Sequence, residues 1–461
     1  MMGFGRIAGL LCLVACAHRV DVPPDEPQSR AIAHYQVTIF DNLGAARVHA
    51  CFKGMAPADL VPMDESAASR LRGAWVDGVP VETKEGRILS SRVSAPACVE
   101  YEAQFERSPI RLEDSSARIL SQTQWLWRPD PFPRELSASI RFRLPGEGQV
   151  SLPWSRSNGA YLPERSAFFV ETFGVFGVFD QQAFSLANTE VDVARLGAWP
   201  VDIDVRRWLS RAVQTSASVG GRFPRDHVQF VIVPVDAPGE QVAFGMLRRG
   251  GGSSILLLPS LDSNAAELES DWVAVHELSH LWLPRVRVQD RWLSEGIATY
   301  LQEVLRARCG LQSGVRAWKR IREGFERGRH SGTGRSLADE SRSMNRTQAY
   351  QRVYWAGVAF ALETDVRLRR ATGGKSTLLL AISDAQSDWD KETHPVRASR
   401  VLAALDEASG TDFIRELGVR YAAGSNFPDT SYVDSPGYRE LRAQITLPAD
   451  DGCKINGESL R

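Results

Sequence analysis

The spacing of apolar residues changes twice along this chain of 461 residues. From residue 31 to residue 180, apolar and polar positions alternate in short runs, as in 97–105 and 136–144. Such alternation places one face of a strand in a core. Turn compositions such as Asp77-Gly78 separate the runs, and no convincing helical period appears. This region therefore predicts a β-sandwich or saddle.

Helical and strand patterns are interleaved from residue 181 to residue 310. Residues 201–218 have helical spacing, whereas 227–234 and 254–259 are short apolar runs that predict buried strands. Between these strands, 241–252 ends in three glycines, which predicts a mobile hairpin or an edge strand.

Two helices follow these strands. Asn264 is expected to cap a single helix from residue 265 to about residue 283, which Pro284 ends. Asp290 is expected to cap the next helix, which runs from residue 291 to about residue 308.

The rest of the chain, residues 311–461, is almost entirely helical in period. Helices are expected at 315–327, 348–370, 377–383, 396–408 and 413–421. The sequence thus predicts an α+β multidomain protein: an N-terminal β-domain, a mixed α/β domain and a helical C-terminal region.

The N-terminus has the features of a targeting segment. Arg6 precedes an apolar run, and the run is too short to span a bilayer. Leu13-Val14-Ala15-Cys16 resembles the bacterial lipobox, in which the cysteine is lipid-modified; an ordinary secretory signal with a chance cysteine is the alternative. We expect a lipoprotein signal at 1–15, a proline-containing tether at 16–30, and an exported protein held at the bacterial cell envelope by Cys16.

The charge balance and the cysteine content bear on the expected partners and on disulfide formation. Lys and Arg together number 55 against 56 acids, and no basic stripe with interleaved aromatics appears, so nucleic acid is not an expected partner. Export would permit disulfides among Cys51, Cys98, Cys309 and Cys453. Cys51 with Cys98, and Cys309 with Cys453, is one arrangement considered, but four cysteines allow three pairings and unpaired thiols remain an alternative.

The chemistry centres on His276-Glu277-x-x-His280. On a helix, positions four apart share one face, so both imidazoles can bind one metal ion. Glu277 is rotated about 100° from His276, which places its carboxylate beside the metal. Two neutral nitrogen ligands and an adjacent base suit zinc hydrolysis.

A zinc hydrolase needs a third protein ligand, for which Glu295 is the candidate. It lies near the start of the next helix, and an antiparallel neighbour about 8–10 Å away brings it within reach of the metal. Thr299, one turn further, is a candidate hydrogen-bond partner for a ligand. The alternative for Glu295, an acid that stabilises a helix start, is weaker beside the histidine motif.

These motifs together resemble the gluzincin zinc metallopeptidases. The spacing from His280 to Glu295 is shorter than in membrane alanyl aminopeptidases. The stretch Arg352-Val-Tyr354-Trp-Ala-Gly357, continued by 365–376, is similar to the glycyl aminopeptidase family. The resemblance covers roughly residues 31–425, and is strong only from about 270 to 376.

The resemblance implies a thermolysin-like catalytic domain over 181–310 and one Zn²⁺ ion on a peptidase. It implies that Tyr354 stabilises the oxyanion, with Tyr350 as the fallback and an ordinary core tyrosine as the alternative. Glu277 would act as the general base. A non-catalytic lipoprotein that keeps the fold for binding, and a zinc hydrolase acting on another substrate, are the competing hypotheses.

Substrate binding is where the chain departs from these families. Their aminopeptidases carry an acid on the edge strand that binds the substrate α-amine. Gly245 and Met246 fit that motif as substrate-binding residues, but Leu247 and Arg248 occupy the region of the acid. A peptide substrate is expected to pair with this strand, with exo- or endopeptidase action open. Arg248 and Arg249 could meet a substrate carboxylate, although the solvated alternative is favoured.

Overall fold

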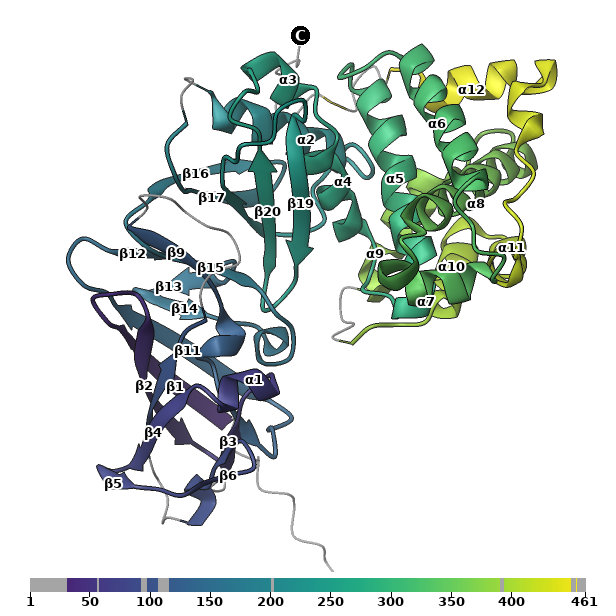
Figure 1. Ribbon diagram of the computed structural model, residues 1–461. Helices are drawn as coiled ribbons and strands as arrows, with labels where there is room; N and C mark the ends of the chain where they lie inside the picture. The colour runs from purple at the N-terminus through teal and green to yellow at the C-terminus, as the bar shows by residue number, and fades with distance from the viewer. Residues whose placement is uncertain are drawn as a thin grey trace, which may run out of the picture.

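The computed structural model describes residues 31–55, 58–92, 98–106, 116–199, 203–389, 394–448 and Cys453. The predicted signal at 1–15, the tether at 16–30 and Cys16 lie outside the described residues. None of the described helices is both long and apolar enough to span a bilayer. An all-β region, a mixed region and a helical region follow one another, in the predicted order (Figure 1).

The N-terminal region is built on an eight-stranded sheet. In spatial order its strands are β13 (Ser155–Ser157), β14 (Ala160–Leu162), β11 (Leu136–Arg143), β1 (Ala31–Ile39), β2 (Ala45–Lys53), β8 (Cys98–Gln104), β4 (Leu71–Val76) and β5 (Val79–Pro80). The first two strands along the chain, β1 and β2, pair antiparallel, and β1 pairs with β11 in parallel. Alternate residues of β1 are buried, as their period of two predicts.

Two smaller sheets and one short helix complete this region. The four-stranded sheet has the order β10 (Arg128–Asp130), β3 (Asp59–Val61), β7 (Arg87–Ile88) and β6 (Thr83–Lys84). The three-stranded sheet has the order β12 (Gln149–Ser151), β15 (Phe173–Gly177) and β9 (Ala117–Ser121), and the helix is α1 (Glu65–Ala68). The buried Trp125 ring meets Phe142 of β11 and Phe176 of β15 edge-on. Aromatic packing thus joins the wide sheet to the three-stranded one.

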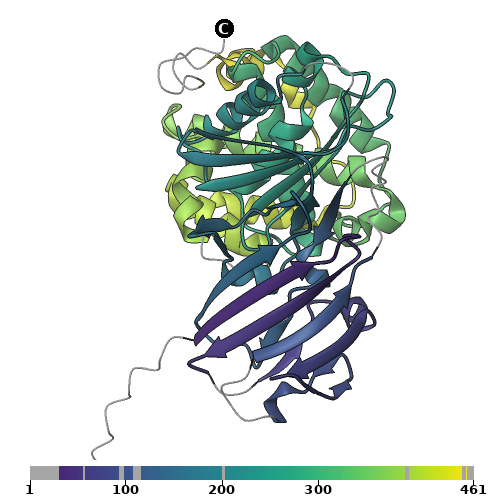
Figure 2. The same ribbon diagram turned by 90° about the vertical axis from the view of Figure 1, so that its left-hand side faces the viewer.

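The mixed region contains a five-stranded sheet, visible above the N-terminal strands in Figure 2. Its order is β16 (Asp180–Leu186), β17 (Thr189–Arg195), β18 (His227–Ile232), β20 (Ser253–Pro259) and β19 (Val242–Arg248). The strand β19 lies at the edge and pairs antiparallel with β20, as one of the two alternatives for this segment predicted. Its outer edge pairs with no other strand among the described residues.

The single helix predicted for 265–283 is wrong. The chain forms α3 (Ala265–Glu269), α4 (Val273–Ser279) and a 3-10 turn (His280–Trp282). Asn264 does cap α3, in a capping box with Glu267. At the break, Asp271 lies just before Trp272, the N-cap of α4, and its side chain accepts from the Val273 N–H at 2.6 Å.

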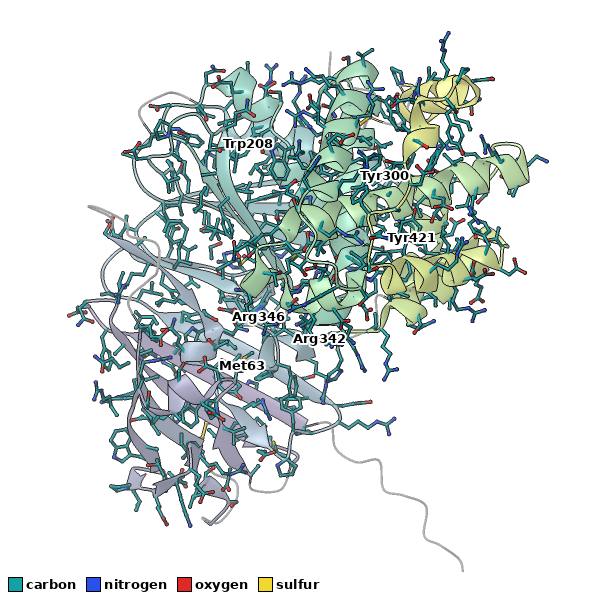
Figure 3. All side chains as sticks on the ribbon, turned by 45° about the vertical axis from the view of Figure 1, so that its right-hand side comes forward. Met63, Trp208, Tyr300, Arg342, Arg346 and Tyr421 are labelled. Carbon is teal, nitrogen blue, oxygen red and sulfur yellow. A yellow bond between two sulfur atoms is a disulfide. The ribbon has the colours of Figure 1, made fainter. Side chains whose placement is uncertain are left out.

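The helical region contains two more helices than expected. Its members are α5 (Arg291–Arg308), α6 (Gly314–Arg329), α7 (Leu337–Thr347), α8 (Tyr350–Thr372), α9 (Leu378–Trp389), α10 (Ala398–Ser409), α11 (Phe413–Ala423) and α12 (Arg439–Thr446). The helix α2 (Val205–Ala217) belongs to the mixed region. Neither α7 nor α12 was predicted. Figure 3 marks Tyr300 and Tyr421 in this region, Trp208 on α2, and Met63 in the N-terminal region.

Asp290 and the cysteines make long-range links. Asp290 precedes α5, but its carboxylate accepts from the Ala398 N–H at 3.0 Å and makes no cap bond to α5, so the capping prediction is wrong in that detail. Disulfides join Cys51 to Cys98 on adjacent strands and Cys309 to Cys453. Of the three possible arrangements, the structure therefore has the one considered first.

Candidate metal centre

Three side chains from three helical elements converge on one point. His276 lies in α4, His280 begins the 3-10 turn, and Glu295 lies in the second turn of α5. Glu295 Oε2 lies 3.4 Å from Nε2 of His276 and 3.4 Å from Nε2 of His280. All three ligand atoms lie within 4.8 Å of one another. The structure brings together the three residues predicted as ligands.

Buried charge makes this cluster unusual. Burial alone would raise the pKa of Glu295, but the imidazoles of His280 and His276 beside its carboxylate lower it well below its usual range. Burial opposes a charge on His276, yet Glu295 and Glu277 raise its pKa. Glu295 Oε2 itself is buried and has no hydrogen-bond donor among the described residues. An orphaned carboxylate oxygen between two imidazole nitrogens fits a bound cation.

The outer nitrogens of both imidazoles are held by partners on α5. His276 Nδ1 lies 2.8 Å from Gln302 Oε1, and His280 Nδ1 lies 3.1 Å from Ser294 Oγ. Gln302 in turn donates to Glu303 at 2.9 Å, which fixes the orientation of its amide. Gln302 Oε1 can only accept, so His276 Nδ1 carries the proton and its Nε2 lone pair is free for a metal; Ser294 Oγ can accept from His280 Nδ1 in the same way.

The predicted partner Thr299 does not perform this task. Its hydroxyl is buried and has no hydrogen-bond partner within the described ranges. Gln302 and Ser294, which sequence reasoning missed, hold the imidazoles in its place. A signal for Gln302 existed, because positions seven apart share a helix face and Gln302 lies two turns beyond Glu295.

The carboxylate of Glu277 faces the edge strand and not the ligands. Its Oε2 accepts from the Leu247 N–H at 2.9 Å. A Cβ at Gly245 would lie 2.4 Å from Val273 Cγ1 and 2.9 Å from Glu277 Cγ. Glycine is needed there because β19 passes directly against α4. Met246, the other predicted substrate-binding residue, lies beside it on the half-buried strand.

Tyr354 of α8 completes the cluster. Its ring stacks on the His276 ring, with centroids 6.1 Å apart and planes 6° from parallel. Burial, and then the nearby Glu295 carboxylate, raise the pKa of Tyr354 above its ordinary value, so the hydroxyl keeps its proton. The fallback residue Tyr350 makes no stacking contact with a ligand in the described structure. Tyr354 is therefore the tyrosine that the structure places against the ligands.

Two glycines allow α8 to come this close. A Cβ at Gly296 would lie 2.2 Å from Gly357 Cα, and one at Gly357 would lie 2.1 Å from the Trp292 carbonyl oxygen. The backbones of α5 and α8 therefore touch where they cross. Gly296 follows Glu295 directly, and Gly357 lies about one turn after Tyr354, so this crossing sets the two side chains side by side.

Neither arginine of the edge strand is simply solvated. Arg248 forms an ion pair with Glu171 of the N-terminal region at 3.1 Å. Arg249 points to the helix side, where it donates to the carbonyl oxygens of Leu283, at 2.8 Å, and of His280. Burial, followed by repulsion from other arginines, lowers the pKa of Arg249 to about 9. The solvated alternative favoured for these residues is wrong for Arg249.

The fold is that of the M1 aminopeptidase N family of zinc metallopeptidases. No protein-family model matches the chain, and no curated protein matches its sequence. The likeness is therefore structural, and it supports the resemblance to gluzincins at the level of the fold.

Two solved structures illustrate this likeness. An aminopeptidase N family protein from Idiomarina loihiensis superposes with a TM-score of 0.66 at 17% identity, over 87% of this chain and 77% of that one. An M1 zinc metallopeptidase from Deinococcus radiodurans gives 0.53 at 16% identity, over 87% and 94%.

The donor set fits the zinc ion of that fold. Two imidazole nitrogens and one carboxylate oxygen are the three protein ligands of many catalytic zinc sites, which keep a fourth position open. His276, His280 and Glu295 supply these donors, and Glu295 Oε2 accepts no hydrogen bond among the described residues, so it can bind a metal ion.

Proposed function

We propose that the protein is a zinc metallopeptidase that hydrolyses peptide bonds with Glu277 as general base. The observation that carries this proposal is the placement of Glu295 Oε2 at 3.4 Å from both imidazole nitrogens. Glu277 of α4, held by the Leu247 N–H of β19, and Tyr354 of α8 both lie beside that point. A site that only binds metal has no use for either group.

The protein residues have distinct roles in this reaction. When bound, zinc supplies a Lewis acid that lowers the pKa of water towards ~7. The Leu247 N–H occupies Oε2 of Glu277, which leaves Oε1 to take a proton from the attacking water and return it to the leaving amine. The protonated hydroxyl of Tyr354 donates to the developing oxyanion, a contact typically worth ~3–4 kcal/mol.

The free edge of β19 is the proposed platform for the substrate. An extended peptide that adds to this edge would run past Gly245, whose missing side chain keeps the approach to Glu277 open. A variant of the Deinococcus enzyme has been solved with a Tyr-Ser-Ala substrate, which supports a peptide as ligand for this fold.

The end of the peptide that is recognised is a separate question. Leu247 stands where the families named above carry the amine-binding acid, and Arg248 beside it is paired with Glu171. With no carboxylate at Leu247, a free α-amine gains no ion pair from this strand. We infer that strict aminopeptidase specificity is relaxed and that blocked peptides are also cleaved.

A peptide library with matched free and acetylated N-termini tests this function. We expect cleavage of both sets, loss of cleavage on chelation, and recovery when zinc is added back. Cleavage restricted to free N-termini would overturn the relaxed specificity but not the peptidase. Full cleavage by the chelated protein would overturn the zinc mechanism itself.

We also propose that the enzyme is exported and anchored to a membrane of the bacterial cell envelope through lipid on Cys16. The proposal rests on the lipobox-like Leu13-Val14-Ala15-Cys16. Cells given labelled palmitate should label the wild-type protein and not Cys16→Ala. Equal labelling of both proteins would contradict the proposal that Cys16 carries the lipid.

A further inference from the structure

A second cavity lies where the three regions of the chain meet. Its volume is about 430 Å³, far more than the ~15 Å³ that one water needs. Ser166 lines it from the N-terminal region, Ser253 at the start of β20 from the mixed region, and Trp389 at the end of α9 from the helical region. Its lining includes neither the three candidate ligands nor Glu277 and Tyr354.

The cavity carries an excess of positive charge. Its lining arginines are Arg222, Arg225, Arg249 and Arg285. Two acids, Glu164 and Asp226, also line it, which leaves a formal charge of +2 with His227 neutral. Among the described residues, no carboxylate lies within the 4.0 Å of an ion pair from Arg249 or Arg285.

Two of these guanidinium groups are held in place by backbone carbonyls. Arg249 donates to the carbonyl oxygens of Leu283 and His280, and Arg225 donates to that of Leu281 at 3.4 Å. Carbonyl oxygens orient the Arg249 guanidinium without neutralising its charge, whereas Arg225 also interacts with the Glu164 carboxylate. Arg225 and Arg285 line the same cavity as Arg249, so the three guanidinium groups repel one another.

We propose that this cavity binds a small free oxyanion of the phosphate class. Guanidinium groups match the oxygens of a tetrahedral oxyanion in bidentate geometry, and such an ion offsets the repulsion among them. Ser166 Oγ already accepts from the Gly251 N–H at 3.0 Å, so its hydroxyl proton can be donated to the ion. Because the walls come from three regions, the anion links them and stabilises the folded chain by mass action.

Calorimetric titration of inorganic phosphate into the zinc-loaded protein tests this site. The informative variant is Arg285→Gln, since Arg285 is exposed at its outer end and its loss should not prevent folding. The matched control is Arg287→Gln, an exposed arginine two positions away that does not line the cavity. We expect saturable binding to wild type and to the control, and affinity about tenfold lower for Arg285→Gln.

A third variant separates this cavity from the metal centre, where phosphate could also bind. In Glu295→Ala, which should lose the metal, phosphate affinity should persist. The unfolding midpoint should rise with phosphate in wild type and less in Arg285→Gln. Equal affinities in the two arginine variants, loss of binding with Glu295→Ala, or no saturable binding would each overturn the proposal. None of these outcomes bears on peptide hydrolysis, which the peptide library measures separately.

Discussion

One wall of the site, made by α4 and α5, and the opposite wall, made by β19, are built in different ways. On the helical wall, His276 is buried, His280 is partly buried, and each has a hydrogen-bond partner for its outer nitrogen. On the strand wall, the central residues are half-buried and the backbone presents an unpaired edge. Where β19 packs against α4, one hydrogen bond among the described residues joins the walls, from the Leu247 N–H to Glu277.

The difference between the two walls indicates that the helical wall carries out the chemical step and the strand wall binds the substrate. The helical wall has one arrangement, because the ligands, their partners and the Gly296–Gly357 crossing constrain one another. The strand wall offers mainly backbone groups, which bind many sequences alike. We infer that substitutions on the helical wall and at Tyr354 change the rate of the chemical step, whereas those on β19 act more weakly.

The largest kinetic effect is expected for Glu277→Gln. The amide cannot accept the proton, so kcat should fall by about 10²–10⁴-fold while zinc remains bound. Glu240→Gln, at an exposed acid before β19, is the control and should behave as wild type. Steady-state kinetics with metal analysis measures both quantities, and comparable turnover in Glu277→Gln would remove the base from the mechanism.

Tyr354→Phe should lower kcat by about 10²–10³-fold with little change in KM, because the hydroxyl acts on the developing oxyanion. Tyr350→Phe, one turn earlier on the same helix, is the matched control. An effect of Tyr350→Phe equal to that of Tyr354→Phe would return both residues to a packing role.

Gln302→Met should weaken zinc affinity by about 10–100-fold, because His276 loses the acceptor that orients it. Gln312→Met provides the control: Gln312 also donates to Glu303, at 2.8 Å, but contacts no ligand. Competition with a chelator of known affinity gives both values. If both variants bind zinc equally weakly, the loss of affinity would come from the lost hydrogen bond to Glu303 and not from the lost contact with His276.

The smallest effect is expected for Gly245→Ala on the strand wall. The added methyl would lie 2.4 Å from Val273 Cγ1 and 2.9 Å from Glu277 Cγ, so both side chains must shift, which should cost about 1–3 kcal/mol of stability with a smaller fall in kcat than Tyr354→Phe. Gly437→Ala, where a Cβ meets nothing within 4 Å, is the control. Denaturant unfolding measures the stability, and a larger kcat loss than that of Tyr354→Phe would contradict the difference between the walls.

The ligand set could be predicted because helical periodicity is a local property. His276 and His280 need only one turn of helix, and Glu295 needs only the next helix alongside. The outer partners were harder to identify, since glutamine and serine occur on many helices. Thr299 was chosen one turn after Glu295, but the partner lies two turns after it, at Gln302.

Elements without a clear apolar stripe were missed. The buried face of α7 includes Glu340 and Ser341, so its apolar pattern is weak. The break between α3 and α4 was missed because the apolar spacing continues through it, and only Asp271, whose side chain accepts from the first N–H of α4, marks the new start. Tertiary contacts decide such positions, and a single sequence does not show them.

The measurement that tests the central claim most directly is the zinc content of three purified proteins: wild type, Glu295→Ala and Thr299→Ala. Both substitutions lie on the same face of α5, but only Glu295 faces the imidazoles. We predict one zinc ion per chain in wild type and in Thr299→Ala, and none at stoichiometric zinc in Glu295→Ala. Zinc bound to Glu295→Ala with wild-type affinity would contradict the account.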